Sequence, residues 1–146
     1  MDVIEFERSP YIVSTDRIKL DLPLIFDFLA NRSYWGKGRS FQTVERSVQN
    51  SLCFGLYENG RQIGFARVVT DQVTFAWLCD VFILESHRSR GLGKWLVECV
   101  VEHPALKTIR RIMLATKDAH ELYRKYGGFS DLEEAECWMQ RVRPYQ

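Results

Sequence analysis

The sequence has no excess of charge of either sign and no long apolar run. Its 146 residues carry 20 basic and 19 acidic side chains, which leaves a net charge of +1. Such a balanced chain has no overall attraction for nucleic acid or for an anionic membrane, so any anion-binding site must be local. No apolar stretch reaches the roughly 18 residues that a membrane-spanning helix needs. These absences argue against nucleic-acid and membrane partners.

Cysteine pairs and metal-ligand spacings are also missing. No CxxC pair occurs, and the three histidines are not spaced with the cysteines as in a zinc site. The first ten residues, MDVIEFERSP, lack the basic and apolar pattern of a secretory signal. We therefore expect no bound metal, a reducing cytoplasmic location and buried free thiols at all four cysteines. These are Cys53, Cys79, Cys99 and Cys137.

Repeats, low-complexity tracts and linkers are absent too, so we expect one domain over residues 1–146. A chain of this length removes about 70% of its unfolded surface from water. Periodicity and turn residues predict a strand, two helices, three strands, a helix, a strand, a helix and a final strand. This order is typical of an α/β (α+β) domain with a mixed sheet. The expected elements are 11–16, 21–35, 40–51, 51–57, 61–69, 73–84, 91–103, 111–116, 118–126 and 136–142.

Several residues mark the ends of these elements. Asp21 and Ser40 precede the first two helices and have the side-chain oxygen that caps a helix N-terminus. Asn59 and Gly60 lie between two apolar strands and tolerate the positive φ of a tight hairpin turn. Pro104 is expected to end the helix that begins at Gly91.

A glycine-rich, basic stretch, HRSRGLGKWL (residues 87–96), joins a long apolar strand to a helix. Glycines allow close backbone approach, and the unpaired N–H groups at a helix start bind phosphate well. Trp95 stands where a Walker A loop needs Ser or Thr, and Leu96 stands where a dinucleotide fingerprint needs glycine. The remaining pattern is Arg-x-x-Gly-x-Gly, Arg88 to Gly93. The alternative is a basic surface turn that only caps the helix.

This loop, with LCDVFIL upstream and AHELYRKYGGF downstream (residues 119–129), resembles the GNAT superfamily of N-acetyltransferases. The expected order of elements is similar to the family fold over nearly the whole chain. The resemblance implies a mostly antiparallel central sheet flanked by helices, and acetyl-CoA as co-substrate. It implies that the backbone of Val81, Phe82 and Ile83 holds the pantetheine arm. It also implies that the pyrophosphate lies against Arg88, Ser89, Arg90, Gly91, Leu92, Gly93 and Lys94.

The resemblance further implies two catalytic residues. Tyr123 falls where many members place a tyrosine that protonates the departing thiolate, a task suited to a phenol with a pKa near 10. Asp80 falls where several amine-acetylating members have an acidic residue facing the acceptor. A lone carboxylate in an apolar strand is costly to bury without a partner, so it is a candidate base or ammonium anchor. Both residues also have structural alternatives, Tyr123 as a packed ring and Asp80 as a carboxylate satisfying backbone groups.

Two departures from the family pattern are present. Cys79 stands where many such members have glutamate, and Thr116 replaces an asparagine that usually precedes the final helix. A nucleophilic Cys79 is disfavoured because no basic partner is visible nearby. His87 is expected to be a solvated loop residue rather than a base.

The acceptor side is less well defined by the sequence. Trp35 lies in the segment that often forms one wall of the acceptor site in the family, and could instead anchor that loop. Arg67 and Trp77 occupy alternate strand positions that could face the same cleft. We give Trp35 and Trp77 as candidate substrate contacts.

The sequence therefore predicts transfer of an acetyl group from acetyl-CoA to a primary amine of a small molecule or peptide. A non-catalytic acyl-CoA-binding module that regulates a partner is the first alternative. A small RNA- or nucleotide-binding domain that uses the same loop is the second, disfavoured by the near-neutral charge. The identity of the amine stays open, and so does a homodimer, which is common among family members.

Overall fold

Six strands form one sheet, in the order in which they occur in the sequence. The computed structural model describes residues 2–144. All neighbouring strands pair antiparallel except the last pair, β5 and β6, which is parallel. The mixed, mostly antiparallel sheet flanked by helices agrees with the expected fold class. The strands are β1 (Glu5–Arg8), β2 (Tyr11–Ser14), β3 (Leu52–Glu58), β4 (Arg61–Thr70), β5 (Phe75–Ile83) and β6 (Arg111–Met113).

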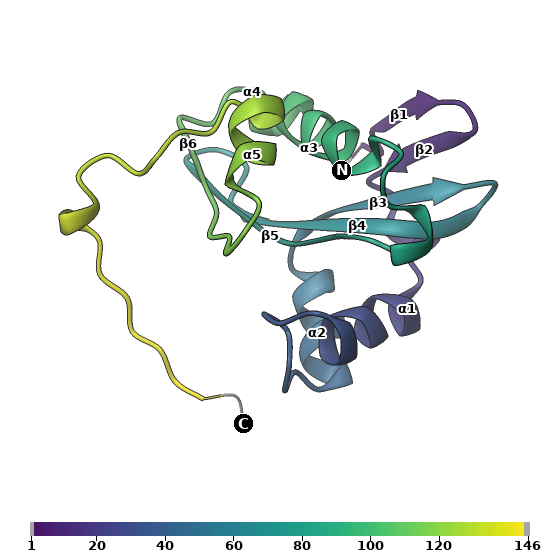
Figure 1. The fold of residues 1–146 in the computed structure, drawn as a ribbon, viewed down its shortest axis with the longest axis horizontal. Helices are drawn as coiled ribbons and strands as arrows, with labels where there is room; N and C mark the ends of the chain where they lie inside the picture. The colour runs from purple at the N-terminus through teal and green to yellow at the C-terminus, as the bar shows by residue number, and fades with distance from the viewer. Residues whose placement is uncertain (1, 145–146) are drawn as a thin grey trace.

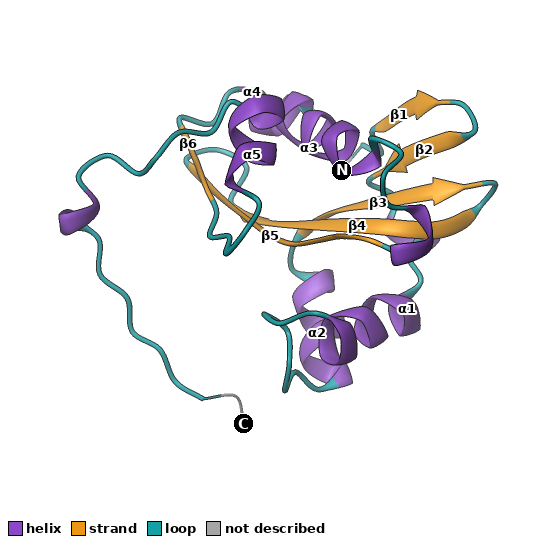
Figure 2. Ribbon diagram, viewed as in Figure 1, coloured by secondary structure: helices purple, strands orange, loops and turns teal. Residues whose placement is uncertain are grey.

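Helices cover both faces of the sheet (Figures 1 and 2). One face carries α3 (Leu92–Glu102), α4 (Pro104–Lys107) and α5 (His120–Gly127), and the other carries α1 (Leu22–Asp27) and α2 (Phe41–Gln49). Each face buries its own apolar core. No helix within residues 2–144 is long and apolar enough to cross a membrane.

The expected end signals are confirmed at three places. The side chain of Asp21 accepts a hydrogen bond from the backbone N–H of Leu24, and that of Ser40 accepts one from Thr43. Asn59 and Gly60 both have positive φ and join β3 to β4 in a two-residue turn.

Strand β5 contains a bulge that changes which way its side chains point. Opposite β4, Arg67 pairs with Cys79 and Phe65 with Phe82, so β5 has one extra residue between these pairs. Asp80, at the bulge, has a φ of 52°. Before the bulge, Leu78 packs in the core beneath α3; after it, Phe82 packs in the core beneath α1 and α2. Because of the bulge, these two side chains of β5 point to opposite faces of the sheet and pack in different cores.

The structure corrects the expected final strand. Residues 136–142 do not join the sheet: a single 3₁₀ turn spans Ala135–Cys137, and the rest runs as an extended segment beyond the body (Figure 1). The apolar pattern favours a strand, but a strand forms only beside a partner, and this segment has none within residues 2–144. Cys137 is consequently exposed rather than buried as expected. Cys79, on β5, is half-buried, which also differs from the expectation.

The N-terminal third differs from expectation in two further respects. An additional strand, β1, pairs with β2. The first helix is shorter than expected, because α1 ends at Asp27 and a wider π turn follows over Phe28–Arg32.

Candidate active site

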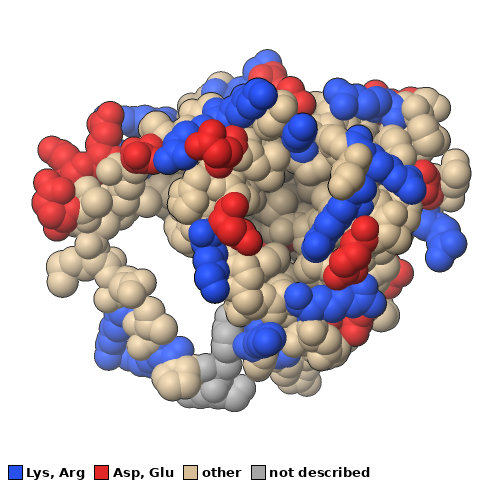
Figure 3. All heavy atoms as spheres, in the orientation of Figure 1, with Lys and Arg blue, Asp and Glu red and all other residues tan. Residues whose placement is uncertain are grey.

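A cavity opens where β5 and β6 separate. The two strands pair only at three positions, from Phe75 with Arg111 to Trp77 with Met113. Beyond them β5 continues to Ile83 beside a cavity of about 620 Å³. Val81, Phe82 and Ile83 all line this cavity, as the resemblance implied for a pantetheine-binding strand. Figure 3 shows a hollow on this face of the molecule, with Lys and Arg side chains along one side.

The glycine-rich loop forms one end of the cavity. Gly91 has a φ of 75°, a conformation that glycine adopts without strain, and it directly precedes α3. No side chain caps α3 at Gly91, so the N–H groups of its first turn remain available to an anion. Gly93 also lines the cavity. A Cβ added at Gly93 would contact only the Ile83 side chain, at 3.9 Å. The loop therefore leaves room for a ligand against the helix start.

The other loop residues divide between the cavity and the protein surface. Arg88, Ser89, Leu92 and Lys94 line the cavity. Arg90 does not; its guanidinium donates to the Tyr11 hydroxyl at 3.2 Å and to the Glu58 carboxylate at 3.4 Å.

The Glu58 carboxylate also contacts His87, the histidine of this loop. Nε2 of His87 lies 3.0 Å from Glu58, and His87 also lines the cavity. The hydrogen bond from His87 lowers the pKa of Glu58. Glu58 therefore joins the loop to β3 through both His87 and Arg90.

Tyr123 enters the cavity from α5. It is buried, its ring packs edge-on against Phe129, and it lines the cavity together with Asp118 and Leu122. Burial, with smaller contributions from Tyr34 and Asp118, raises the pKa of Tyr123 to about 12. The phenol consequently keeps its proton across the whole neutral and mildly basic range.

Asp80 lies beside this cavity in a cluster of donors. Trp35 donates its indole N–H to Oδ1 at 3.0 Å, Arg39 donates to both carboxylate oxygens at 2.9 Å, and Arg67 donates to Oδ2 at 2.8 Å. The Asp80 side chain is fully buried, and the two arginine side chains are 13% exposed. This carboxylate is doubly paired, and it anchors Trp35, which lines the cavity.

The sequence did not single out several residues of this region. Arg39 comes from the loop before α2, 41 residues from its partner, and no local pattern marks it. Tyr34 lines the cavity, and its hydroxyl accepts a hydrogen bond from the backbone N–H of Lys117 at 3.1 Å. That contact joins the loop after α1 to the loop before α5. The sequence marked this region only through Trp35, in the segment that resembles the acceptor-site wall of the family.

Two further candidates lie outside the cavity lining. Trp77 is half-buried on β5 where this strand still pairs with β6. Cys79 lies opposite Arg67, and burial raises the pKa of its thiol to about 11. A thiol with this pKa is protonated at neutral pH, which agrees with the expectation that Cys79 is not a nucleophile.

A bulged, splayed strand beside a glycine-rich helix start defines an α/β domain that can hold an extended anionic ligand. Residues 22–129 match the Acetyltransferase (GNAT) family. A protein of Gibberella zeae, provisionally named an acetyltransferase, is 33% identical over 149 residues, covering 87% of this chain and 83% of its own length. The chain therefore belongs to the GNAT acetyltransferase family, whose general reaction is acetyl transfer from acetyl-CoA.

One solved structure gives the same assignment, and another shares the fold. A GNAT-family protein of Xanthomonas campestris pv. campestris, also provisionally named an acetyltransferase, is 45% identical with a TM-score of 0.88, over 92% of this chain and 94% of that one. A GNAT-family acetyltransferase of Elizabethkingia anophelis, solved with acetyl-CoA bound, shares the fold at 15% identity and a TM-score of 0.61, over 82% and 76% of the two chains. Within residues 2–144, no three His, Cys, Asp or Glu side chains cluster as a metal site would require.

Proposed function

We propose that this chain transfers an acetyl group from acetyl-CoA to a primary amine of a small molecule or peptide by direct attack. The cavity carries the proposal, because it joins the free stretch of β5, the start of α3 and Tyr123 in one space of about 620 Å³. A space of that size holds an elongated ligand of several hundred daltons.

The residues present fit acetyl-CoA. When bound, acetyl-CoA supplies the thioester whose carbonyl carbon the amine attacks. The α3 start, with Gly91, Gly93 and the charge of Arg88 and Lys94, would hold the pyrophosphate. The backbone of Val81 to Ile83 would hold the pantetheine arm. The N–H groups of this backbone would stabilise the negative charge that develops on the carbonyl oxygen.

Tyr123 is proposed to return a proton to the departing sulfur. A buried phenol with a raised pKa is neutral in the resting enzyme and can donate to a thiolate. Its position on the cavity wall supports this role.

For the amine proton we propose water as the acceptor and Asp80 as a positioning residue. Trp35, Arg39 and Arg67 donate to the buried Asp80 carboxylate, and these contacts hold it in place. Its proposed task is to fix Trp35, and through it the wall on which the acceptor amine would lie.

The decisive measurement is thiol release from acetyl-CoA, followed across a panel of polyamines, amino acids, aminoglycosides and peptides. We expect turnover with at least one amine class and formation of its N-acetyl product. Binding of acetyl-CoA without thiol release on any amine would instead favour the non-catalytic acyl-CoA-binding module.

A further inference from the structure

The residues on either side of Arg90 have left-handed backbone. Ser89 has a φ of 67° and Gly91 a φ of 75°. Glycine adopts this conformation without strain, but a serine adopts it at a cost in free energy and keeps it only where surrounding contacts hold it. Ser89 and Gly91 also line the cavity, and Gly91 directly precedes α3. The loop proposed to meet the pyrophosphate therefore needs contacts that hold its shape.

Arg90 provides one of those contacts, because its side chain lies outside the cavity that its neighbours line. Its guanidinium donates to the Tyr11 hydroxyl at 3.2 Å and to Oε2 of Glu58 at 3.4 Å. Tyr11 and Glu58 are paired residues of β2 and β3, so their side chains lie on the same face of the sheet. Arg90 thus joins the loop to two neighbouring strands.

Glu58 contacts the other side of the loop with its second oxygen. Oε1 lies 3.0 Å from Nε2 of His87, and Nδ1 of the same ring lies 2.7 Å from Oγ of Ser86. Glu58 is itself fixed, since this last residue of β3 pairs with both β2 and β4. The turn after β3 and the loop before α3 lie at the same end of the sheet (Figure 1). One carboxylate therefore contacts the loop before and after Arg88 and Ser89.

We infer that Glu58 is a positioning residue for acetyl-CoA: by holding His87 and Arg90, it keeps residues 88–91 in the conformation that meets the pyrophosphate. Arg90 then acts through the backbone of the loop and is not itself a ligand of the phosphates. The Arg-x-x-Gly-x-Gly motif contains no residue of β3, so Glu58 lies outside it. The identity of the ligand rests on the proposed function, whereas the order of the loop does not.

The order of the loop is measured first, in the protein without ligand. We expect backbone amide order parameters of about 0.85 for residues 88–93 of the wild type, falling toward about 0.6 in Glu58→Ala. The side chains of Glu58 and Arg90 are 26% and 44% exposed, and pairs this exposed contribute little to the free energy of unfolding. The urea midpoint should therefore stay nearly unchanged. Glu5→Ala removes an exposed ion pair with Lys19 on the same sheet, and as the matched control should change neither quantity.

Binding of coenzyme A, followed by calorimetric titration, separates the two possible roles of Arg90. We expect Glu58→Ala and Arg90→Ala each to raise the Kd for coenzyme A about tenfold. The double variant should raise it no further, because both changes release the same loop. A directly ligating Arg90 predicts the opposite for Glu58→Ala, since freeing the guanidinium would tighten binding. Tighter binding in Glu58→Ala, or additive losses in the double variant, would overturn the inference.

The two measurements distinguish this role of Glu58 from the proposed function. Unchanged order parameters in Glu58→Ala would overturn the inference whether or not coenzyme A binds. A loop that is rigid in the wild type and loosened in Glu58→Ala, in a protein with no affinity for coenzyme A, would support the contact between Glu58 and the loop. The same result would contradict the proposed function.

Discussion

The two sides of the proposed site differ in how they are encoded. The side assigned to acetyl-CoA comes from one stretch, Val81 to Lys94, with Tyr123 added from α5. The side assigned to the acceptor comes from Trp35, Arg39 and Arg67, gathered around Asp80 from 13 to 45 residues away. A contiguous motif constrains the backbone and can be recognised in a sequence. A cluster held by buried charge depends on tertiary packing, so it can change with the substrate while the motif stays.

The largest effect is expected on stability, from Asp80→Asn, which removes the carboxylate at the centre of the acceptor-side cluster and leaves the acetyl-CoA side unchanged. Removing the carboxylate takes away the negative charge that two largely buried guanidinium groups share, which costs about 3 kcal/mol in the free energy of unfolding. Urea denaturation measures it. Glu85→Gln is the control: it removes a half-exposed pair with Arg32, worth less than about 1 kcal/mol. Equal losses in the two variants would mean that Asp80 does not hold the cluster together.

The second prediction concerns chemistry at Tyr123. Tyr123→Phe keeps the ring and removes the proton donor, so kcat should fall about 100-fold while the Kd for acetyl-CoA changes little. Tyr126→Phe on the same helix is the control, because Tyr126 is half-buried and lies outside the cavity lining. Unchanged turnover in Tyr123→Phe would exclude the phenol as the acid.

The pKa of Tyr123 adds a test in the same experiment. The protonated phenol is the active form, and burial moves its pKa up to about 12. Activity that depends on this proton should therefore persist through pH 10 and fall only as the pH approaches 12. A wild-type pH profile whose basic limb falls near pH 9, and which Tyr123→Phe abolishes, would contradict this environment.

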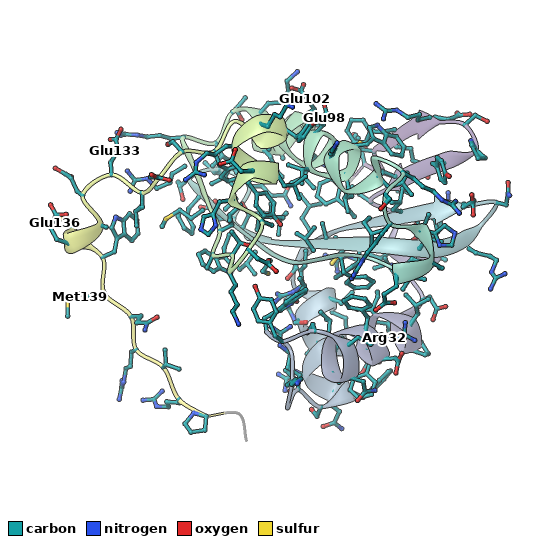
Figure 4. All side chains as sticks on the ribbon, in the orientation of Figure 1. Arg32, Glu98, Glu102, Glu133, Glu136 and Met139 are labelled. Carbon is teal, nitrogen blue, oxygen red and sulfur yellow. The ribbon has the colours of Figure 1, made fainter. Side chains whose placement is uncertain are left out.

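The smallest effect is expected on the acetyl-CoA side, from Gly93→Ala. The added methyl group has room in the protein and favours the helix by up to about 1 kcal/mol, so stability should not fall. It would occupy space beside the α3 start, where lengthening one charge-assisted hydrogen bond raises the Kd for acetyl-CoA about tenfold, or 1.4 kcal/mol. Glu98→Ala, on the outer side of α3 in Figure 4, is the control for calorimetric titration. Equal affinities would place the pyrophosphate elsewhere.

Local signals predicted most of the fold. Helix caps at Asp21 and Ser40 and the turn at Asn59-Gly60 act over three or four residues, so the sequence contains all that determines them. The additional strand β1 was missed because its residues, EFER, are three charged side chains and one aromatic, and they form a strand only through pairing with β2. The prediction of a final strand at residues 136–142 was wrong for a related reason, because a strand needs a neighbouring strand as well as an apolar pattern.

The site divides in the same way. The loop at Arg88 to Lys94 and the helix start that follows it could be predicted, because both depend only on nearby backbone. Arg90 points to Glu58 rather than into the cavity, and nothing in the motif distinguishes it from Arg88. The donors around Asp80 required the packed structure, since α2, β3 and β4 separate Arg39 from Asp80 in the sequence.

The bulge in β5 makes this strand sensitive to length rather than to composition. Leu78 and Phe82 pack in different cores, and apolar replacements of similar volume would preserve that packing. Deleting one residue between them would restore simple alternation and turn Val81, Phe82 and Ile83 to the opposite faces. Substitutions can therefore change the side chains that line this cavity, whereas an insertion or deletion at the bulge would redirect the whole strand beside it.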